Sequence, residues 1–188
     1  MDFGAEKAVA LAKPDRSRKG SVDVGISELV ELLNSQPSYY TTSSCAGRIT
    51  VLREGRKKAD RAIVRVWHEP IRTRVELPQL LSLSRQREHR SLWFRFEPAI
   101  LHVACRDLAA AQRLIKLCRL AGLKKSGIME FGRRIIVEIV GPEHIEAPLR
   151  AVIGKRYLSS LIAAANKKLL QNEKRIAALC KSFEQRKI

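Results

Sequence analysis

The chain of 188 residues is long enough for one ordinary domain, and its 45% apolar residues are enough for a hydrophobic core. Its 36 Lys and Arg against 19 Asp and Glu give a net charge of +17, which favours nucleic acid over an acidic protein or a membrane as partner. No signal peptide pattern is visible, and charges interrupt every apolar stretch before the roughly 18 residues that a membrane span needs.

The four cysteines, Cys45, Cys105, Cys118 and Cys180, are far apart and form no C-x-x-C pair. This spacing argues against a zinc ribbon and against a disulfide scaffold. We therefore expect a soluble protein in a reducing cytoplasm.

The N-terminal quarter is predicted to be helical with two polar loops. Residues 3–12 can form a short helix, and residues 15–24 are a polar, basic loop. A helix begins at about Ile26 and ends in the Asn-Ser-Gln-Pro sequence, because proline disfavours helix in the residue before it. Residues 39–48 are predicted as a second loop.

The middle of the chain is predicted to contain paired strands. Residues 47–52 and 62–67 are strands around a basic hairpin, and a helix is allowed after Pro78. Residues 92–96 and 99–104 are two further strands that meet at the Glu97-Pro98 break.

The last part of the chain is predicted to add one helix, two strands and a long terminal helix. Apolar residues repeat at helical spacing over residues 108–118, with Asp107 as cap and Gly122 as stop. Residues 127–131 and 134–140 are strands about a tight turn at Gly132. After Gly141-Pro142 the rest is predicted to be helix, with one apolar face.

These elements predict an α+β (mixed α/β) fold. We expect a single domain over residues 1–188, with a largely antiparallel mixed sheet flanked by helices, ending in a basic amphipathic helix at about 156–186. No G-x-G-x-x-G follows a strand, and neither G-x-x-x-x-G-K-[ST] nor H-E-x-x-H occurs. A standard Rossmann methyltransferase is therefore disfavoured, and no metal is expected.

Residues 39–48, Tyr-Tyr-Thr-Thr-Ser-Ser-Cys-Ala-Gly-Arg, are dense in hydroxyl groups. Backbone N–H groups and hydroxyls of such a segment can bind an anion or a polar base edge, and Arg48 can fork onto a phosphate or carboxylate. The alternative is a hydroxyl-rich turn that leads into a strand.

Residues 38–49 resemble the signature of the tRNA wybutosine-synthesizing protein 3 family. Four further segments resemble the same family in the same order: residues 15–23, Trp67-His68, residues 96–103 and residues 126–128. The resemblance covers about residues 3–150 and is to an archaeal-like, single-domain member. One departure is Ala46, where serine is common in the family, so a hydroxyl at this position cannot be essential to the chemistry.

The resemblance implies an S-adenosylmethionine-dependent tRNA methyltransferase of wyosine and wybutosine biosynthesis. Its substrate would be the 7-aminocarboxypropyl-demethylwyosine intermediate at the guanosine 3′ of the anticodon of phenylalanine tRNA, methylated on ring nitrogen N4. The sequence shows no S-adenosylmethionine fingerprint of its own. The alternative is a non-catalytic basic protein that binds RNA through phosphate contacts.

Asp23, His68 and Ser44 are the predicted catalytic residues. Asp15 and His102 are further candidates for removing the proton from the substrate. Asp23 has a structural alternative as a helix cap, and Asp15 can instead be an exposed loop residue. The residues predicted to bind the cofactor are Ser43, Ser44, Gly47, Arg48, Trp67, Glu97 and His102.

Three of these have structural alternatives. Trp67 can stack on a base or lie in the core, and His102 can be a satisfied core histidine. Glu97 can orient a histidine, bind the methionine amino group, or be a surface carboxylate at a strand end.

Cys45 is predicted to be a small packing residue rather than a nucleophile, because direct methyl transfer needs no covalent enzyme intermediate. The residues predicted to bind RNA are Ser17, Lys19, Ser21, Lys167, Lys168, Lys174 and Arg175. For the terminal helix, the alternative is an ordinary solubilising face.

Overall fold

The computed structural model describes residues 2–13, 21–55, 61–85, 92–149 and 154–185. These residues form two compact units. Unit 1 consists of residues 1–46, 99–142 and 172–188, and unit 2 consists of residues 47–98 and 143–171. The chain therefore passes from one unit to the other at residues 46–47, 98–99, 142–143 and 171–172.

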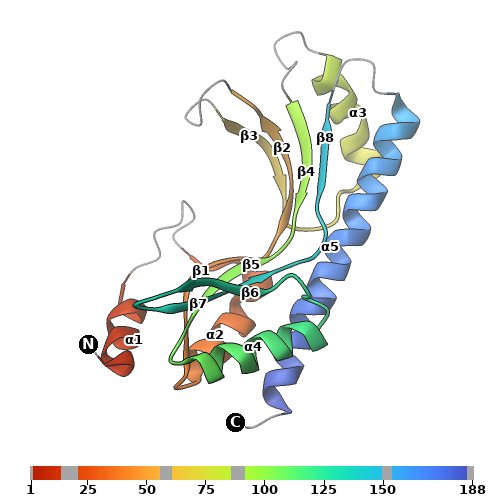
Figure 1. The fold of residues 1–188 in the computed structure, drawn as a ribbon. Helices are drawn as coiled ribbons and strands as arrows, with labels where there is room; N and C mark the ends of the chain where they lie inside the picture. Colours follow the sequence, from red (N-terminus) through yellow and green to blue (C-terminus); the bar gives the residue numbers. More distant parts are fainter. Residues whose placement is uncertain (1, 14–20, 56–60, 86–91, 150–153, 186–188) are drawn as a thin grey trace. The chain divides into compact units, whose positions relative to one another are not determined.

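Unit 1 is built on a four-stranded antiparallel sheet in the order β1-β5-β7-β6. Its strands are β1 (Tyr39–Cys45), β5 (Ile100–Cys105), β6 (Gly127–Phe131) and β7 (Ile135–Val140). Apolar residues alternate along β5 and β7, so Leu101, Val103 and Val137 enter one buried core. The core also contains residues of α2 (Ser27–Ser35), α4 (Leu108–Leu120) and the C-terminal part of α5 (Lys155–Glu184), with α4 drawn along the sheet in Figure 1.

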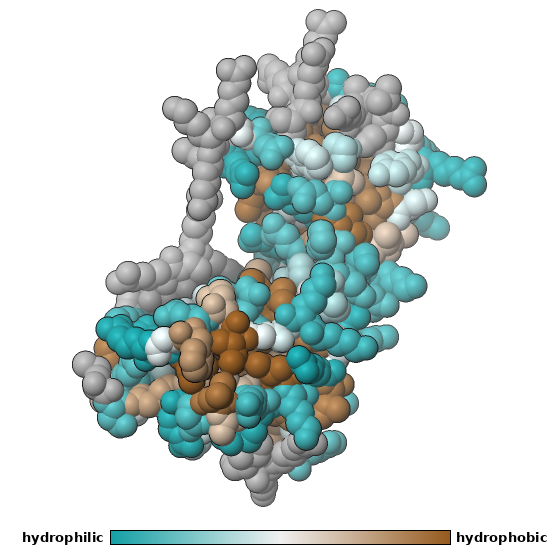
Figure 2. Space-filling model, in the orientation of Figure 1, coloured by the Kyte–Doolittle hydropathy of each residue, from teal (hydrophilic) through white to brown (hydrophobic). Residues whose placement is uncertain are grey.

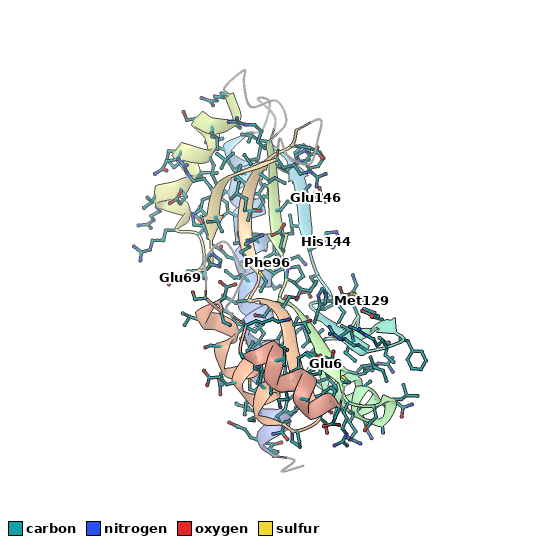
Figure 3. The ribbon with its side chains drawn as sticks, turned by 90° about the vertical axis from the view of Figure 1, so that its left-hand side faces the viewer. Glu6, Glu69, Phe96, Met129, His144 and Glu146 are labelled. Atoms are coloured by element: carbon teal, nitrogen blue, oxygen red, sulfur yellow. The ribbon has the colours of Figure 1, made fainter. Side chains whose placement is uncertain are left out.

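The opposite face of this sheet is covered at one end by α1 (Phe3–Leu11). Tyr40, Ala104 and Ile136 are buried there, and the ring of Phe3 lies 5.4 Å from that of Tyr40 between centroids. Glu6 on α1, labelled in Figure 3, forms an ion pair with Arg134. Along β1, β5 and β7, the next residues on this face beyond α1 are polar.

The ends of α4 are as predicted. The Asp107 carboxylate accepts a hydrogen bond of 2.7 Å from the Ala110 N–H, which satisfies an otherwise unpaired donor of the first turn and holds the pKa of Asp107 below its usual value. Gly122, with φ of +84°, follows the helix in the left-handed region that favours glycine.

Unit 2 contains a second antiparallel sheet, in the order β3-β2-β4-β8. Its strands are β2 (Arg48–Arg53), β3 (Ala62–Trp67), β4 (Leu92–Glu97) and β8 (Ile145–Pro148). Alternate residues such as Ile49, Val51 and Phe94 form a core with α3 (Thr73–Arg85) and the first part of α5. In this core region the Asn166 side chain on α5 accepts a hydrogen bond of 2.8 Å from the Ile71 N–H and donates one of 2.9 Å to the Ile71 carbonyl.

The predicted α+β class is confirmed, and its antiparallel strands divide between two sheets. The strand predictions at residues 47–52, 62–67, 92–96, 99–104, 127–131 and 134–140 are confirmed with shifts of one residue or so at their ends. The single domain over residues 1–188 stays a prediction. None of the described helices has the length and apolar character needed to cross a membrane.

Four predictions of secondary structure are wrong. Residues 39–45 are strand β1 and not a loop, because β5 pairs with them and tyrosine and threonine suit a half-buried strand. Val24, assigned to a loop, begins the short 3₁₀ helix η1 (Val24–Ile26). Helix α3 starts at Thr73 and includes Pro78, since burial of Leu77 and Leu80 outweighs the proline. Strand β8 lies in a stretch predicted to be helix, where pairing with β4 decides the conformation.

Candidate functional site

The hydroxyl-rich segment continues from β1 through the two-residue connection Ala46-Gly47 into β2. Gly47 in this connection has φ of +89°, a backbone conformation in which a side chain would be strained. Glycine is therefore favoured at this position, and the predicted role of Gly47 in cofactor binding stays a prediction. Ala46 ends the first segment of unit 1 and Gly47 begins unit 2, so the segment contributes residues to both units.

The backbone of Ala46 is held by two side chains of unit 1. The Asp23 carboxylate accepts a hydrogen bond of 3.2 Å from the Ala46 N–H. Asn172, which is 2% exposed, donates to the Ala46 carbonyl at 2.8 Å and accepts from the Ala99 N–H at 2.8 Å. Asp23 makes no side-chain hydrogen bond to the N-terminus of η1, so it is not a side-chain cap, and its catalytic role stays a prediction.

Ser43 and Ser44 lie on opposite faces of the unit 1 sheet. Ser44 is paired with Leu101, whose side chain is in the core, and Ser44 is half-buried. Ser43 is paired with His102 and exposed, because successive residues of a strand point to opposite faces. The two predicted cofactor-binding serines therefore cannot contact one ligand from the same face of β1.

His102 lies on the uncovered part of the unit 1 sheet, and its side chain is 28% exposed. Its Nδ1 lies 2.9 Å from the Ser43 hydroxyl oxygen, and its Nε2 lies 3.4 Å from Glu138 Oε1. His102 is thus hydrogen-bonded at both nitrogens and is not a core residue. Glu138 was not among the residues predicted from the sequence, although a single carboxylate in the apolar strand Ile-Ile-Val-Glu-Ile-Val could have indicated it.

Arg48 and Glu97 form an ion pair across β2 and β4 of unit 2, with Arg48 Nε 2.8 Å from Glu97 Oε2. Their side chains are 34% and 40% exposed. They lie on the sheet face opposite to Ile49, whose side chain is in the core. Glu97, one candidate for orienting a histidine, is therefore engaged with Arg48.

Trp67 is the cross-strand partner of Ile49 and packs against the unit 2 core. Cross-strand partners lie on the same face, so Trp67 and the Arg48–Glu97 pair are on opposite faces of this sheet. This arrangement favours the core alternative for Trp67. His68 follows β3 and is exposed, which leaves its predicted catalytic role open.

The predicted RNA-binding residues divide between described and undescribed parts of the chain. Ser17 and Lys19, together with Asp15, lie outside the described residues, and Ser21 is exposed. On α5, Lys167 and Lys174 are exposed, whereas Lys168 and Arg175 are half-buried. The Arg175 side chain packs beside Gly122, where an added Cβ would lie 3.4 Å from Arg175 Nε.

Three of the cysteines are buried thiols in the structure. Burial raises the pKa of Cys105 and Cys118 to about 12 and that of Cys180 to about 11. These groups stay protonated near neutral pH, and a protonated thiol is a poor nucleophile. Cys45 is half-buried on β1, paired with Ile100.

We expect Cys45→Ser and Cys45→Ala to keep most of the activity and to destabilise the protein by about 1 kcal/mol, because each removes only a half-buried thiol without breaking a charged contact. Turnover and urea unfolding of both variants measure this. A complete loss of activity in either variant at parental stability would show that the thiol takes part in the reaction.

Other features of the described residues do not add to the candidate site. A cavity of about 440 Å³ in unit 2 is lined by Arg65 and residues of α3, and its lining contains none of the predicted site residues. Within the described ranges, no group of three or more His, Cys, Asp and Glu side chains is placed to hold a metal ion.

A solved structure described as the PH1069 protein from Pyrococcus horikoshii has the same fold. It matches with a TM-score of 0.76 at 29% identity, over 95% of this chain and 91% of that chain. The family model described as Methyltransferase TYW3 matches residues 5–185, and thus runs through both units. The chain belongs to this methyltransferase family, which confirms the resemblance noted in its sequence.

Two curated relatives differ in how much of their length the chain covers. A protein of Archaeoglobus fulgidus, named tRNA(Phe) 7-((3-amino-3-carboxypropyl)-4-demethylwyosine(37)-N(4))-methyltransferase, is 33% identical over 97% of this chain and 92% of its own length. The tRNA wybutosine-synthesizing protein 2/3/4 of Arabidopsis thaliana is 34% identical over 93% of this chain, which spans only 20% of that protein.

Proposed function

We propose that this protein transfers a methyl group from S-adenosylmethionine to ring nitrogen N4 of 7-aminocarboxypropyl-demethylwyosine in phenylalanine tRNA. The modified nucleoside derives from the guanosine 3′ of the anticodon. The observation that carries the proposal is the similarity to the Archaeoglobus fulgidus methyltransferase over nearly the full length of both chains. The net charge of +17 supports a polyanionic substrate.

The chemistry of unit 2 fits the amino-acid end of S-adenosylmethionine, which carries a carboxylate and an ammonium group. Arg48 and Glu97 present a guanidinium and a carboxylate side by side, both partly exposed. A guanidinium binds a carboxylate through paired N–H donors, and a carboxylate accepts from an ammonium group. When bound, S-adenosylmethionine supplies an electrophilic methyl group on a sulfonium centre.

The protein's own task in such a reaction is to align the reacting groups and to remove one proton. Alignment converts an encounter of two molecules into a unimolecular step, which is worth several kcal/mol when the geometry is close to that of the transition state. Within unit 2, Arg48 is held in β2, whose pairing with β4 places it opposite Glu97. The ring N–H must lose its proton to a basic group of the site.

The direct test uses phenylalanine tRNA that carries the demethylated intermediate, together with labelled S-adenosylmethionine. We expect one methyl group on N4, identified by mass spectrometry of the nucleoside, and no transfer to the same tRNA with unmodified guanosine. Absence of transfer by the folded protein to the modified tRNA would overturn the proposal.

Cofactor binding in the absence of RNA separates the enzyme from a non-catalytic RNA-binding protein. A ligand at about 100 times its dissociation constant stabilises its protein by about 2.7 kcal/mol. We therefore expect S-adenosylmethionine, or its demethylated product, to raise the melting temperature. A protein that only binds RNA would melt at the same temperature with and without either compound.

We propose that the basic residues of α5 bind the phosphates of the tRNA. Changing Lys167, Lys168, Lys174 and Arg175 to glutamine removes four charges and keeps the side-chain stems, including the one beside Gly122. The plot of log K for tRNA binding against log salt concentration should become less steep, by the contribution of up to about four phosphate contacts. Cofactor affinity should change little. A matched control removes four exposed charges elsewhere: Arg72, Arg74, Lys116 and Arg119. Equal slopes in both variants would assign the helix to solubility.

A further inference from the structure

Three polar side chains form a hydrogen-bonded row across the unit 1 sheet. Ser43 on β1, His102 on β5 and Glu138 on β7 are direct cross-strand partners. The Ser43 hydroxyl oxygen lies 2.9 Å from His102 Nδ1, and His102 Nε2 lies 3.4 Å from Glu138 Oε1. Because the three residues belong to adjacent strands, the sheet itself fixes their order, and sites on regular elements are held more rigidly than sites on loops.

The carboxylate determines which nitrogen of His102 carries the proton. An ionised carboxylate only accepts hydrogen bonds, so the contact with Glu138 requires the proton on Nε2. In the neutral imidazole, Nδ1 then has a free electron pair, and the Ser43 hydroxyl at 2.9 Å can donate a hydrogen bond to it. In this state His102 can take up a proton at Nδ1, and Glu138 stabilises the imidazolium that forms.

The row is accessible from one side of the sheet. The side chains of His102 and Glu138 are 28% and 35% exposed, and Ser43 is exposed. The neighbouring part of the same face is covered by α1, which carries Glu6 (Figure 3). Charged groups on this face include Glu130 on β6 and Arg134, which pairs with Glu6; burial raises the pKa of Tyr40, and Arg133 lies close enough to lower it.

We infer that His102 accepts the ring N–H proton during methyl transfer, through the Ser43 hydroxyl, and that Glu138 is its positioning residue. The inference rests on the proposed function, in which a ring nitrogen is methylated. The ring proton passes to Ser43 Oγ while the hydroxyl proton passes to His102 Nδ1. The electron pair left on the ring nitrogen forms the bond to the methyl carbon, and the pair of the broken S–C bond stays on sulfur.

The first test is kinetic. We expect His102→Ala and Ser43→Ala to lower kcat by about 10²- to 10⁴-fold, the usual contribution of general acid–base catalysis, with KM for S-adenosylmethionine nearly unchanged. Added imidazole should restore part of the activity of His102→Ala, because it can occupy the space of the missing side chain and accept the proton. Glu130→Gln is the matched control on the same face and should keep parental kcat.

The second test determines the tautomer of His102 in the absence of substrate and cofactor. Nitrogen NMR of the histidine rings distinguishes the two neutral tautomers, and the His102 signal is assigned by its loss in His102→Ala. We expect the Nε2–H tautomer in the parental protein. In Glu138→Ala this preference should weaken and kcat should fall, whereas Glu138→Gln should keep the tautomer through its amide oxygen and still lose activity with the negative charge.

The outcomes separate this inference from the proposed function. A folded His102→Ala protein with parental kcat, no response of that variant to imidazole, or an Nδ1–H tautomer in the parental protein would each overturn the inference. If the parental protein transfers no methyl group to the modified tRNA, the proposed function fails instead. The tautomer of His102 then still shows whether its proton lies on Nε2, toward Glu138, and leaves Nδ1 as the acceptor toward Ser43.

Discussion

Replacing Arg48 with alanine is expected to lower kcat/KM for methyl transfer at least tenfold, with the fold intact. A hydrogen bond to a charged group is worth about 1.5–3 kcal/mol, which corresponds to about 10- to 150-fold in rate or affinity. Loss of the pair with Glu97 should change stability little, because both side chains are more than a third exposed. For this variant, steady-state kinetics measures kcat/KM, calorimetry measures the affinity for the cofactor, and urea unfolding measures the stability.

Two further variants show what Arg48 contributes. Arg48→Lys keeps the positive charge but lacks the planar fork, so we expect activity between those of the parental protein and Arg48→Ala. Arg65→Ala removes one exposed charge from the same sheet and should keep parental activity, which controls for the general attraction of tRNA. A folded Arg48→Ala protein with parental turnover would contradict the assignment of Arg48 to the site.

Much of the fold could be predicted because local signals and tertiary contacts agree. The apolar alternation of residues 92–96 predicts β4, and the same residues enter the unit 2 core. Asp107 and Gly122 predict the ends of α4, and both make the contacts that those residue types usually make at helix ends. At these positions the local sequence pattern is sufficient to predict the structure.

Strands β1 and β8 could not be predicted, because long-range pairing determines them. Residues 39–45 are polar and resemble a loop in composition, yet β5 supplies partners for their backbone groups. Residues 145–148 are too few to show a pattern, and β4 holds them as an edge strand. Glu146 on this strand, labelled in Figure 3, accepts a hydrogen bond of 2.6 Å from Arg95 on β4.

The geometry of the candidate site could not be predicted from its residue types. The signature segment drew attention to Ser43, Gly47 and Arg48, whose roles stay predictions, and the alternation of side chains along β1 separates Ser43 from Ser44. The contact between His102 and Glu138 depends on the register of β5 and β7, 36 residues apart in the chain. Surface features also escaped prediction: Figure 2 shows apolar surface on unit 1, where Ile128, Met129 and Phe131 of β6 are exposed.

Asn172→Ala is expected to destabilise unit 1 by about 2–6 kcal/mol. The variant leaves the Ala46 carbonyl and the buried Ala99 N–H without their partner, and each unsatisfied buried group costs about 1–3 kcal/mol. Urea unfolding measures the change, with Glu173→Ala, at the exposed next position, expected within about 0.5 kcal/mol of the parental protein. Activity should fall as well, because Ala46 is followed directly by Gly47 and Arg48 in the chain. A loss of stability below about 1 kcal/mol would show that other groups or water satisfy the two backbone atoms, and that Asn172 does not hold this segment.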